Sequence, residues 1–176
     1  MKKKNLAIIF ALLLPALSHA DVATVMKVSK NKNEKNVLHY KVQYDKSSCE
    51  FTSGVYAEWK MDEEEGQWKP LSESMNLIKK PLWPNSLQVS GTELQFVTPA
   101  MEDFQQKKIL SSSDIRLKVE FGTENGCSIS NETEVRGQII NVIELKSNLG
   151  FLGGVNSVIV RGRTLDGRWY EETFKP

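Results

Sequence analysis

The side chains best suited to chemistry are few and widely spaced in this chain. Its 176 residues contain two histidines, His19 and His39, and two cysteines, Cys49 and Cys127. A histidine base needs a nucleophile and an orienting acid beside it. His19 lies in a segment that we expect to be removed, and two cysteines with one histidine fall short of a four-ligand zinc site unless carboxylates complete it. We therefore interpret His39 as an ordinary surface histidine, expect no metal and no cofactor, and do not favour an enzyme.

The first twenty residues have the three parts of a secretory signal peptide. Lys2–Lys4 form a positive start, residues 6–17 are mainly apolar, and Ser18-His19-Ala20 is a small-x-small cleavage site. We expect cleavage after Ala20, which leaves residues 21–176 as one mature domain in the periplasm or outside the cell. No later stretch approaches the roughly 20 apolar residues of a transmembrane helix, so no transmembrane anchor is expected.

The charge pattern argues against binding to nucleic acid. The formal net charge of the whole chain is only +1, and the three leader lysines account for its positive sign. Binding to phosphate backbones requires a basic stripe or patch, whereas only Lys79-Lys80 and Lys107-Lys108 form basic pairs outside the leader. Nucleic acid is not an expected partner.

The two cysteines predict a disulfide. An even number of cysteines in an exported chain favours pairing, because thiols oxidise in that compartment. A bond between Cys49 and Cys127 closes a long loop and should stabilise the fold by about 4 kcal/mol. No Cys-x-x-Cys spacing is present to support a redox-active thiol instead.

Alternation of apolar and polar residues predicts an all-β fold. In residues 38–44, Leu38, Tyr40 and Val42 alternate with polar side chains, a pattern typical of a half-buried strand. Similar or weaker patterns predict strands at 22–29, 55–61, 87–90, 93–98, 115–121, 138–146, 155–165 and 168–174. Asp166-Gly167 suits a two-residue hairpin turn, residues 99–108 could form a short helix, and residues 71–84 should be a long connection.

These elements favour an antiparallel β-sandwich, immunoglobulin-like or similar, of about 7 to 9 strands. A small β-barrel is the alternative, because short strands with evenly spaced turns also fit that architecture.

The glycine-rich connection at residues 148–154 is a candidate binding loop. It places Phe151 and Leu152 among three glycines. If these side chains point outward they could enter a groove of a partner or a lipid surface, and if they fold back they cover the open end of the core.

Aromatic residues form a second candidate binding set. Trp68 and Trp83 fall in segments that look irregular, so either could stack on a sugar ring or fill an end of the sandwich. Trp169 and Tyr170 are neighbours, so one of them must face away from the core in a regular strand. Trp59 belongs to the core pattern.

Carboxylates offer a catalytic alternative. Asp62 to Glu65 precede Gly66 and read best as a solvated hairpin tip, since calcium loops space their ligands differently. A hydrolase could instead use Asp62, Glu63 or Glu144. Glycoside hydrolysis would need two such acids facing one cleft about 5 to 10 Å apart.

The order of segments resembles the bacterial domain of unknown function 4833 family. The resemblance rests on Ser29-Lys30-Asn31-Lys32-Asn33, on residues 55–59 before an acidic Glu-Gly turn, and on residues 140–145 with residues 158–162 and the Asp166-Gly167 hairpin. It covers most of the mature chain, although the Tyr-Trp spacing near Trp59 is longer than in the family. It implies an exported or envelope-associated all-β domain with no catalytic residues to carry over.

These features predict an exported, non-catalytic binding module of the periplasm or envelope, with a protein or glycan as partner. The alternatives are a carboxylate-dependent hydrolase of envelope material and a carrier of a small apolar ligand, held between sheets or inside a barrel.

Overall fold

The computed structural model describes residues 20–30, 37–60, 67–71, 82–122, 126–149 and 155–175. This part of the chain contains twelve strands and one helix. In chain order they are β1 Ala20–Lys30, β2 Val37–Asp45, β3 Glu50–Phe51, β4 Tyr56–Lys60, β5 Trp68–Pro70, β6 Asn85–Ser90, β7 Glu93–Val97, α1 Pro99–Gln106, β8 Asp114–Phe121, β9 Cys127–Val135, β10 Gln138–Leu149, β11 Val155–Thr164 and β12 Trp169–Phe174. The all-β fold class with one short helix is therefore confirmed.

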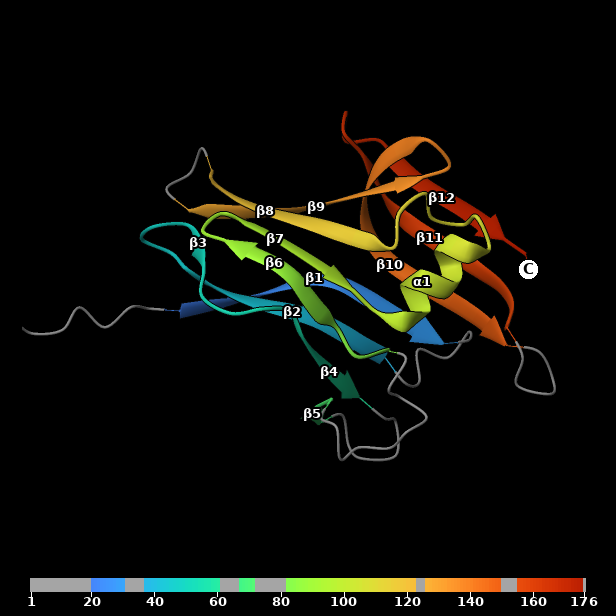
Figure 1. The fold of residues 1–176 in the computed structure, drawn as a ribbon, viewed down its shortest axis with the longest axis horizontal. Helices are drawn as coiled ribbons and strands as arrows, with labels where there is room; N and C mark the ends of the chain where they lie inside the picture. Colours follow the sequence, from blue (N-terminus) through green and yellow to red (C-terminus); the bar gives the residue numbers. More distant parts are fainter. Residues whose placement is uncertain are drawn as a thin grey trace, which may run out of the picture.

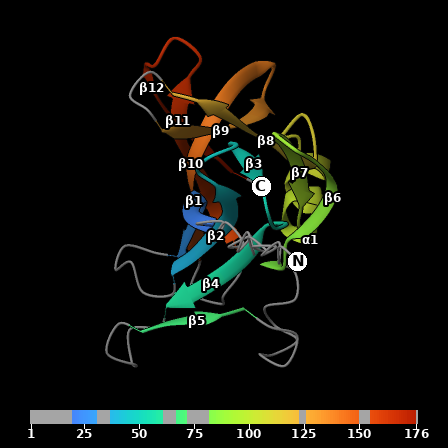
Figure 2. The same cartoon turned by 90° about the vertical axis from the view of Figure 1, so that its left-hand side faces the viewer.

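The strands form one strongly curled sheet that resembles half a barrel (Figure 1). Its main order is β5-β4-β2-β1-β10-β9-β8-β7-β6, and β11 with β12 continues from the far side of β10. We call β5, β4, β2, β1, β10, β11 and β12 the first limb of the sheet, and β9, β8, β7 and β6 the second limb. Figure 2 shows the first limb with β6, β7 and α1 beside it. The curl brings the inner faces of the two limbs together.

Alternation along the strands positions the core. In β2, Leu38, Tyr40 and Val42 are buried between less buried neighbours, as the sequence pattern predicts. Rings from the two limbs meet across the core, where Tyr40 and Phe96 have centroids 5.6 Å apart. Strand β3 also approaches the turn between β6 and β7, where the backbone N–H of Phe51 donates to the carbonyl oxygen of Gly91 at 2.7 Å.

One buried side chain, Asn131 of β9, lies where β10 stops pairing with β9 and begins to pair with β1. We call this point the branch of the sheet. Strand β10 pairs with β9 at residues 138–140 and with β1 only from Glu144 onward. The Asn131 Nδ2 atom lies at this branch and donates to the carbonyl oxygens of Val25 and Val142, each at 2.6 Å. Both carbonyls lie beside register shifts, so the amide supplies hydrogen bonds that the strand ladders leave unmade.

Three strand expectations need correction. The sheet is not purely antiparallel, because β1 and β10 run parallel. The described residues hold more than the expected strands, including β9, whose buried positions are Asn131, Thr133 and Val135. Two of these three are polar, so hydrophobic alternation could not show this strand. Trp68 lies on the short strand β5 rather than in an irregular segment.

The closing hairpin between β11 and β12 is confirmed, with a different loop. Thr164 N donates to Arg168 O at 3.0 Å and Gly167 N donates to Thr164 O at 2.8 Å. These bonds enclose a three-residue loop, not the two-residue turn expected. Gly167 has φ of 82°, the left-handed conformation that ends such loops and that glycine adopts freely.

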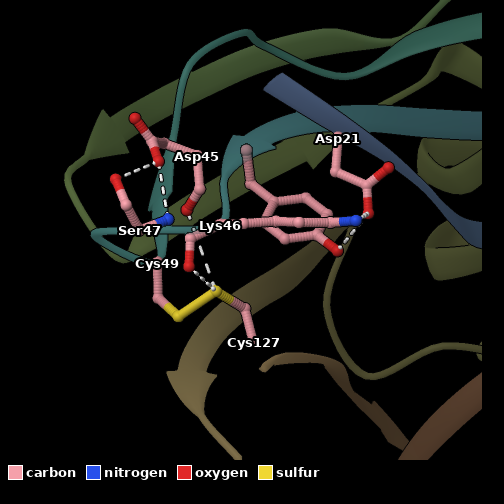
Figure 3. The surroundings of a disulfide bond; sticks show 7 residues. Asp21, Asp45, Lys46, Ser47, Cys49 and Cys127 are labelled. Atoms are coloured by element: carbon pink, nitrogen blue, oxygen red, sulfur yellow. Dashed lines mark hydrogen bonds and ion pairs between the residues drawn. A yellow bond between two sulfur atoms is a disulfide. The ribbon is translucent and has the colours of Figure 1, made fainter. Parts of the chain in front are cut away.

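The expected disulfide between Cys49 and Cys127 is present, with the two Cα atoms 5.5 Å apart. It ties the turn between β2 and β3 to the first residue of β9 (Figure 3). Beside it, Lys46 Nζ pairs with the Asp21 carboxylate at 2.8 Å, and the Tyr44 hydroxyl donates to the same carboxylate at 2.9 Å. The start of β1 and the disulfide turn are thus held at one end of the sheet.

Candidate functional site

The main candidate site is an apolar pocket of about 310 Å³ between α1 and the strands β1, β2 and β10. We call it the α1 pocket. Its lining is mainly apolar, and methionine makes part of it adaptable in shape. The apolar side chains around it are Met26, Val28, Leu82, Ala100, Met101, Phe104 and Leu145.

Helix α1 forms the outer wall of this pocket. Thr98 caps the helix by accepting a hydrogen bond from Met101 N at 3.3 Å, and Pro99 follows at the first helical position, where its missing N–H is harmless. Met101 and Phe104 are three residues apart, so both reach the same face of the helix. That face is turned to the sheet, since Met101 is buried and Phe104 packs against the core.

The polar groups of the α1 pocket are mostly engaged. The Tyr40 hydroxyl donates to the carbonyl oxygen of Leu82 at 2.6 Å. Burial raises the pKa of Tyr40 well above its usual value, so this phenol stays neutral and offers no charge to a ligand. The Asp103 carboxylate pairs with Lys107 at 2.8 Å on the exposed side of the helix. Such a cavity suits an apolar guest.

A second pocket of about 390 Å³ adjoins the first at the start of α1. We call it the Trp83 pocket. Trp83, Pro84 and Pro99 supply rings, and Asn85 and Glu102 supply polar side chains. The Trp83 Nε1 atom is buried without a hydrogen-bond partner among the described residues, so any accessible part of the indole is carbon.

Trp68 belongs to a different surface, the outer face of β2, β4 and β5. Trp68 is 38% exposed, and its ring lies against His39 with the two ring centroids 4.2 Å apart. Desolvation, followed by the charges of Lys41 and Lys27, lowers the pKa of His39, so the imidazole is neutral near pH 7. His39 is therefore half-buried beneath an aromatic ring rather than an open surface histidine.

Glu144 lies in a row of charges across the same outer face. Its carboxylate accepts hydrogen bonds from Ser29 and from Arg161, the latter at 3.0 Å, and Lys27 Nζ lies 3.9 Å away. Desolvation alone would raise its pKa, but the bonds from Ser29 and Arg161 and the nearby positive charges bring the pKa below its usual value. An ionised, fully engaged carboxylate is poorly suited to act as the proton donor of a hydrolase.

We expect Glu144→Gln to reduce stability by about 1 to 2 kcal/mol at pH 7, because the charge-assisted bonds are lost. Since the folded-state pKa is depressed, this contribution is present above the unfolded pKa of about 4.3 and disappears as the pH falls through the folded value. Urea unfolding from pH 7 to pH 3 should therefore show wild type losing more stability than E144Q.

Glu171→Gln provides the matched control, because Glu171 also contacts Arg161 but is 44% exposed. Its effect should stay within about 0.5 kcal/mol at pH 7. Parallel pH profiles for wild type and E144Q would show that the Glu144 pairs do not stabilise the fold.

Of the site residues expected from the sequence, those that the structure describes do not lie together. Phe151, Leu152, Asp62 and Glu63 lie outside the described residues, so the predictions about them stay predictions. Trp83 and Trp68 line separate surfaces. Trp169 is 56% exposed while Tyr170 packs against the core, which confirms that the two neighbours face opposite ways.

Sequence reasoning missed the α1 pocket itself. The expected helix at 99–108 was found, and the spacing of Met101 and Phe104 is the signal that could have marked its buried face. Their partners Met26 and Leu145 lie far away in sequence, and only the packing of α1 on β1 and β10 brings these side chains together.

Comparison with known proteins returns no matching family model, no matching curated protein and no matching solved structure. Within the described ranges, no three side chains of histidine, cysteine, aspartate or glutamate gather where they could hold a metal ion. The same ranges include no helix long and apolar enough to cross a membrane.

Proposed function

We propose that this chain is an exported, non-catalytic binding protein of the bacterial periplasm or envelope, and that its ligand is a small apolar molecule held in the α1 pocket. The observation that carries the proposal is the apolar lining of a pocket of about 310 Å³ between helix and sheet. This volume lies at the lower end of the range of roughly 300 to 1,000 Å³ for small-molecule sites. Of the functions considered, a carrier of a small apolar ligand fits this geometry best.

One feature supports the proposed compartment. The Cys49–Cys127 disulfide fits an oxidising environment. The family resemblance stays a prediction, because the comparisons neither support nor contradict it.

For the architecture we propose sandwich-like closure rather than a complete barrel. The two limbs share one core, and β5 and β6 end the main strand order without a ladder between them. The approach of β3 to the turn before β7 relies on the bond from Phe51 to Gly91. A barrel would need a continuous ladder there.

The other proposed partner, an envelope glycan or protein, would meet the exposed ring of Trp68. The hydrolase alternative is less well supported, because Glu144 is held in ion pairs and does not line the α1 pocket or the Trp83 pocket.

The proposal is tested by titrating the purified protein with 1-decanol in a calorimeter. We expect saturable binding in wild type and a loss of about tenfold or more in Val28→Trp, since the new ring displaces at least two ligand methylenes worth about 0.8 kcal/mol each. Val28 lines the pocket, whereas Val22 on the same strand is exposed and does not. Val22→Trp is thus the matched control.

Ala100→Leu, which narrows the same pocket from α1, provides a second blocking variant if V28W does not fold. No heat of binding in wild type, or undiminished binding in a folded blocking variant, would overturn the proposal.

A further inference from the structure

We infer that the ligand is an amphiphile with an ammonium-type cationic end, whose alkyl chain fills the α1 pocket and whose charged end lies in the Trp83 pocket. This inference rests on the proposed function and names the chemical class of the ligand. The two pockets share Thr98 and Pro99 as lining residues. A single molecule can therefore reach both by passing the first turn of α1.

The charges around the two pockets favour a cation. Among the described residues that line them, the only charged side chains are Asp103 in the α1 pocket and Glu102 in the Trp83 pocket. Lys107 pairs with Asp103, while Glu102 is exposed and makes no ion pair with another described residue. Glu102 is thus the carboxylate available to a ligand.

The side chains that line the Trp83 pocket also suit an ammonium group. Because Trp83 Nε1 is buried, the indole can present only carbon atoms to a ligand. Pro84 and Pro99 add apolar walls. An ammonium group is attracted to the face of an aromatic ring and to a carboxylate at the same time.

The start of a helix normally favours an anion through its free N–H groups. Here Pro99 has no N–H and the N–H of Met101 is already bonded to Thr98, so of the first three helical residues only Ala100 has an N–H left for an anion. The acidic side chain of Glu102 in the first turn further repels a negative end. Fatty-acid carboxylates are therefore disfavoured relative to alkylammonium ions.

The experiment compares three ligands of equal chain length by calorimetry, each below its micelle concentration and at low ionic strength. We expect decyltrimethylammonium to bind about threefold to tenfold more tightly than 1-decanol, and decanoate to bind most weakly. Glu102→Gln should reduce the preference for the ammonium over the alcohol by about twofold to fivefold. Adding salt should reduce it similarly.

Glu120→Gln is the matched control, because Glu120 is an exposed carboxylate that lines neither pocket. Trp83→Leu keeps apolar contact but removes the ring, so it should also lower ammonium affinity while circular dichroism reports the fold. A lysophosphatidylethanolamine titration distinguishes a lipid headgroup from a free alkylamine as the source of the ammonium group.

Equal affinity for the ammonium and the alcohol in wild type would overturn this inference, as would an equal effect of E102Q and E120Q. Both results leave the proposed apolar site standing. Failure of all three ligands to bind would instead overturn the proposed function.

Discussion

Replacing both Cys49 and Cys127 by serine is expected to lower the free energy of unfolding by about 4 kcal/mol. The disulfide spans 78 residues of sequence, and in the chain-entropy model a closed loop of that length strongly restricts the unfolded chain. It also links the β2–β3 turn to β9 across the two limbs of the sheet. Urea unfolding followed by tryptophan fluorescence measures the loss.

The control uses the reducing agent itself. Wild type in dithiothreitol should unfold at a midpoint close to that of the double variant, whereas the double variant should not respond to reductant. Coincident unfolding curves for oxidised and reduced wild type would contradict the prediction.

Asn131→Leu is the second substitution with a large expected effect. It removes the amide that serves the carbonyl oxygens of Val25 and Val142 and leaves both buried without that donor. Each unsatisfied buried acceptor costs about 1 to 3 kcal/mol, so the loss for the two carbonyl oxygens should be about 2 to 6 kcal/mol. Denaturant unfolding measures the loss, and hydrogen exchange should show faster opening around β1 and β10.

Asn131→Asp should be at least as damaging as Asn131→Leu, because a carboxylate would face two carbonyl oxygens in a buried site. Asn156→Asp is the control, since Asn156 lies exposed on β11 and should change stability by less than about 0.5 kcal/mol. An N131L variant as stable as N156D would show that the branch does not depend on the amide.

Local patterns in the sequence were enough to locate most of the secondary structure. Alternation in β2 and β8 separates core from solvent at every second residue. Asp166-Gly167 marks the closing hairpin, because glycine readily adopts the positive φ that Gly167 has there. Pro99 marks the start of α1, because proline is favoured at the first helical position. These signals depend only on neighbouring residues, so no knowledge of the rest of the fold is needed to interpret them.

The candidate site was much harder to predict. Trp68 and Trp83 were named as candidate binding residues, but the sequence could not show that they line separate surfaces. Strand β9 was not predicted, because two of its buried positions are the polar residues Asn131 and Thr133 and it therefore lacks hydrophobic alternation. Asn131 is buried because its amide bonds to backbone at the branch of the sheet.

The sequence alone therefore determined the all-β class, the short helix and the pairing of the two cysteines. Only the tertiary structure decided the parallel contact of β1 with β10 and the curl that faces one limb with the other. It also decided the α1 pocket, because Met26, Met101 and Leu145 meet there from three distant segments. Strand patterning specifies which side of each strand is apolar, whereas pairing and curvature depend on contacts between segments that are far apart in the chain.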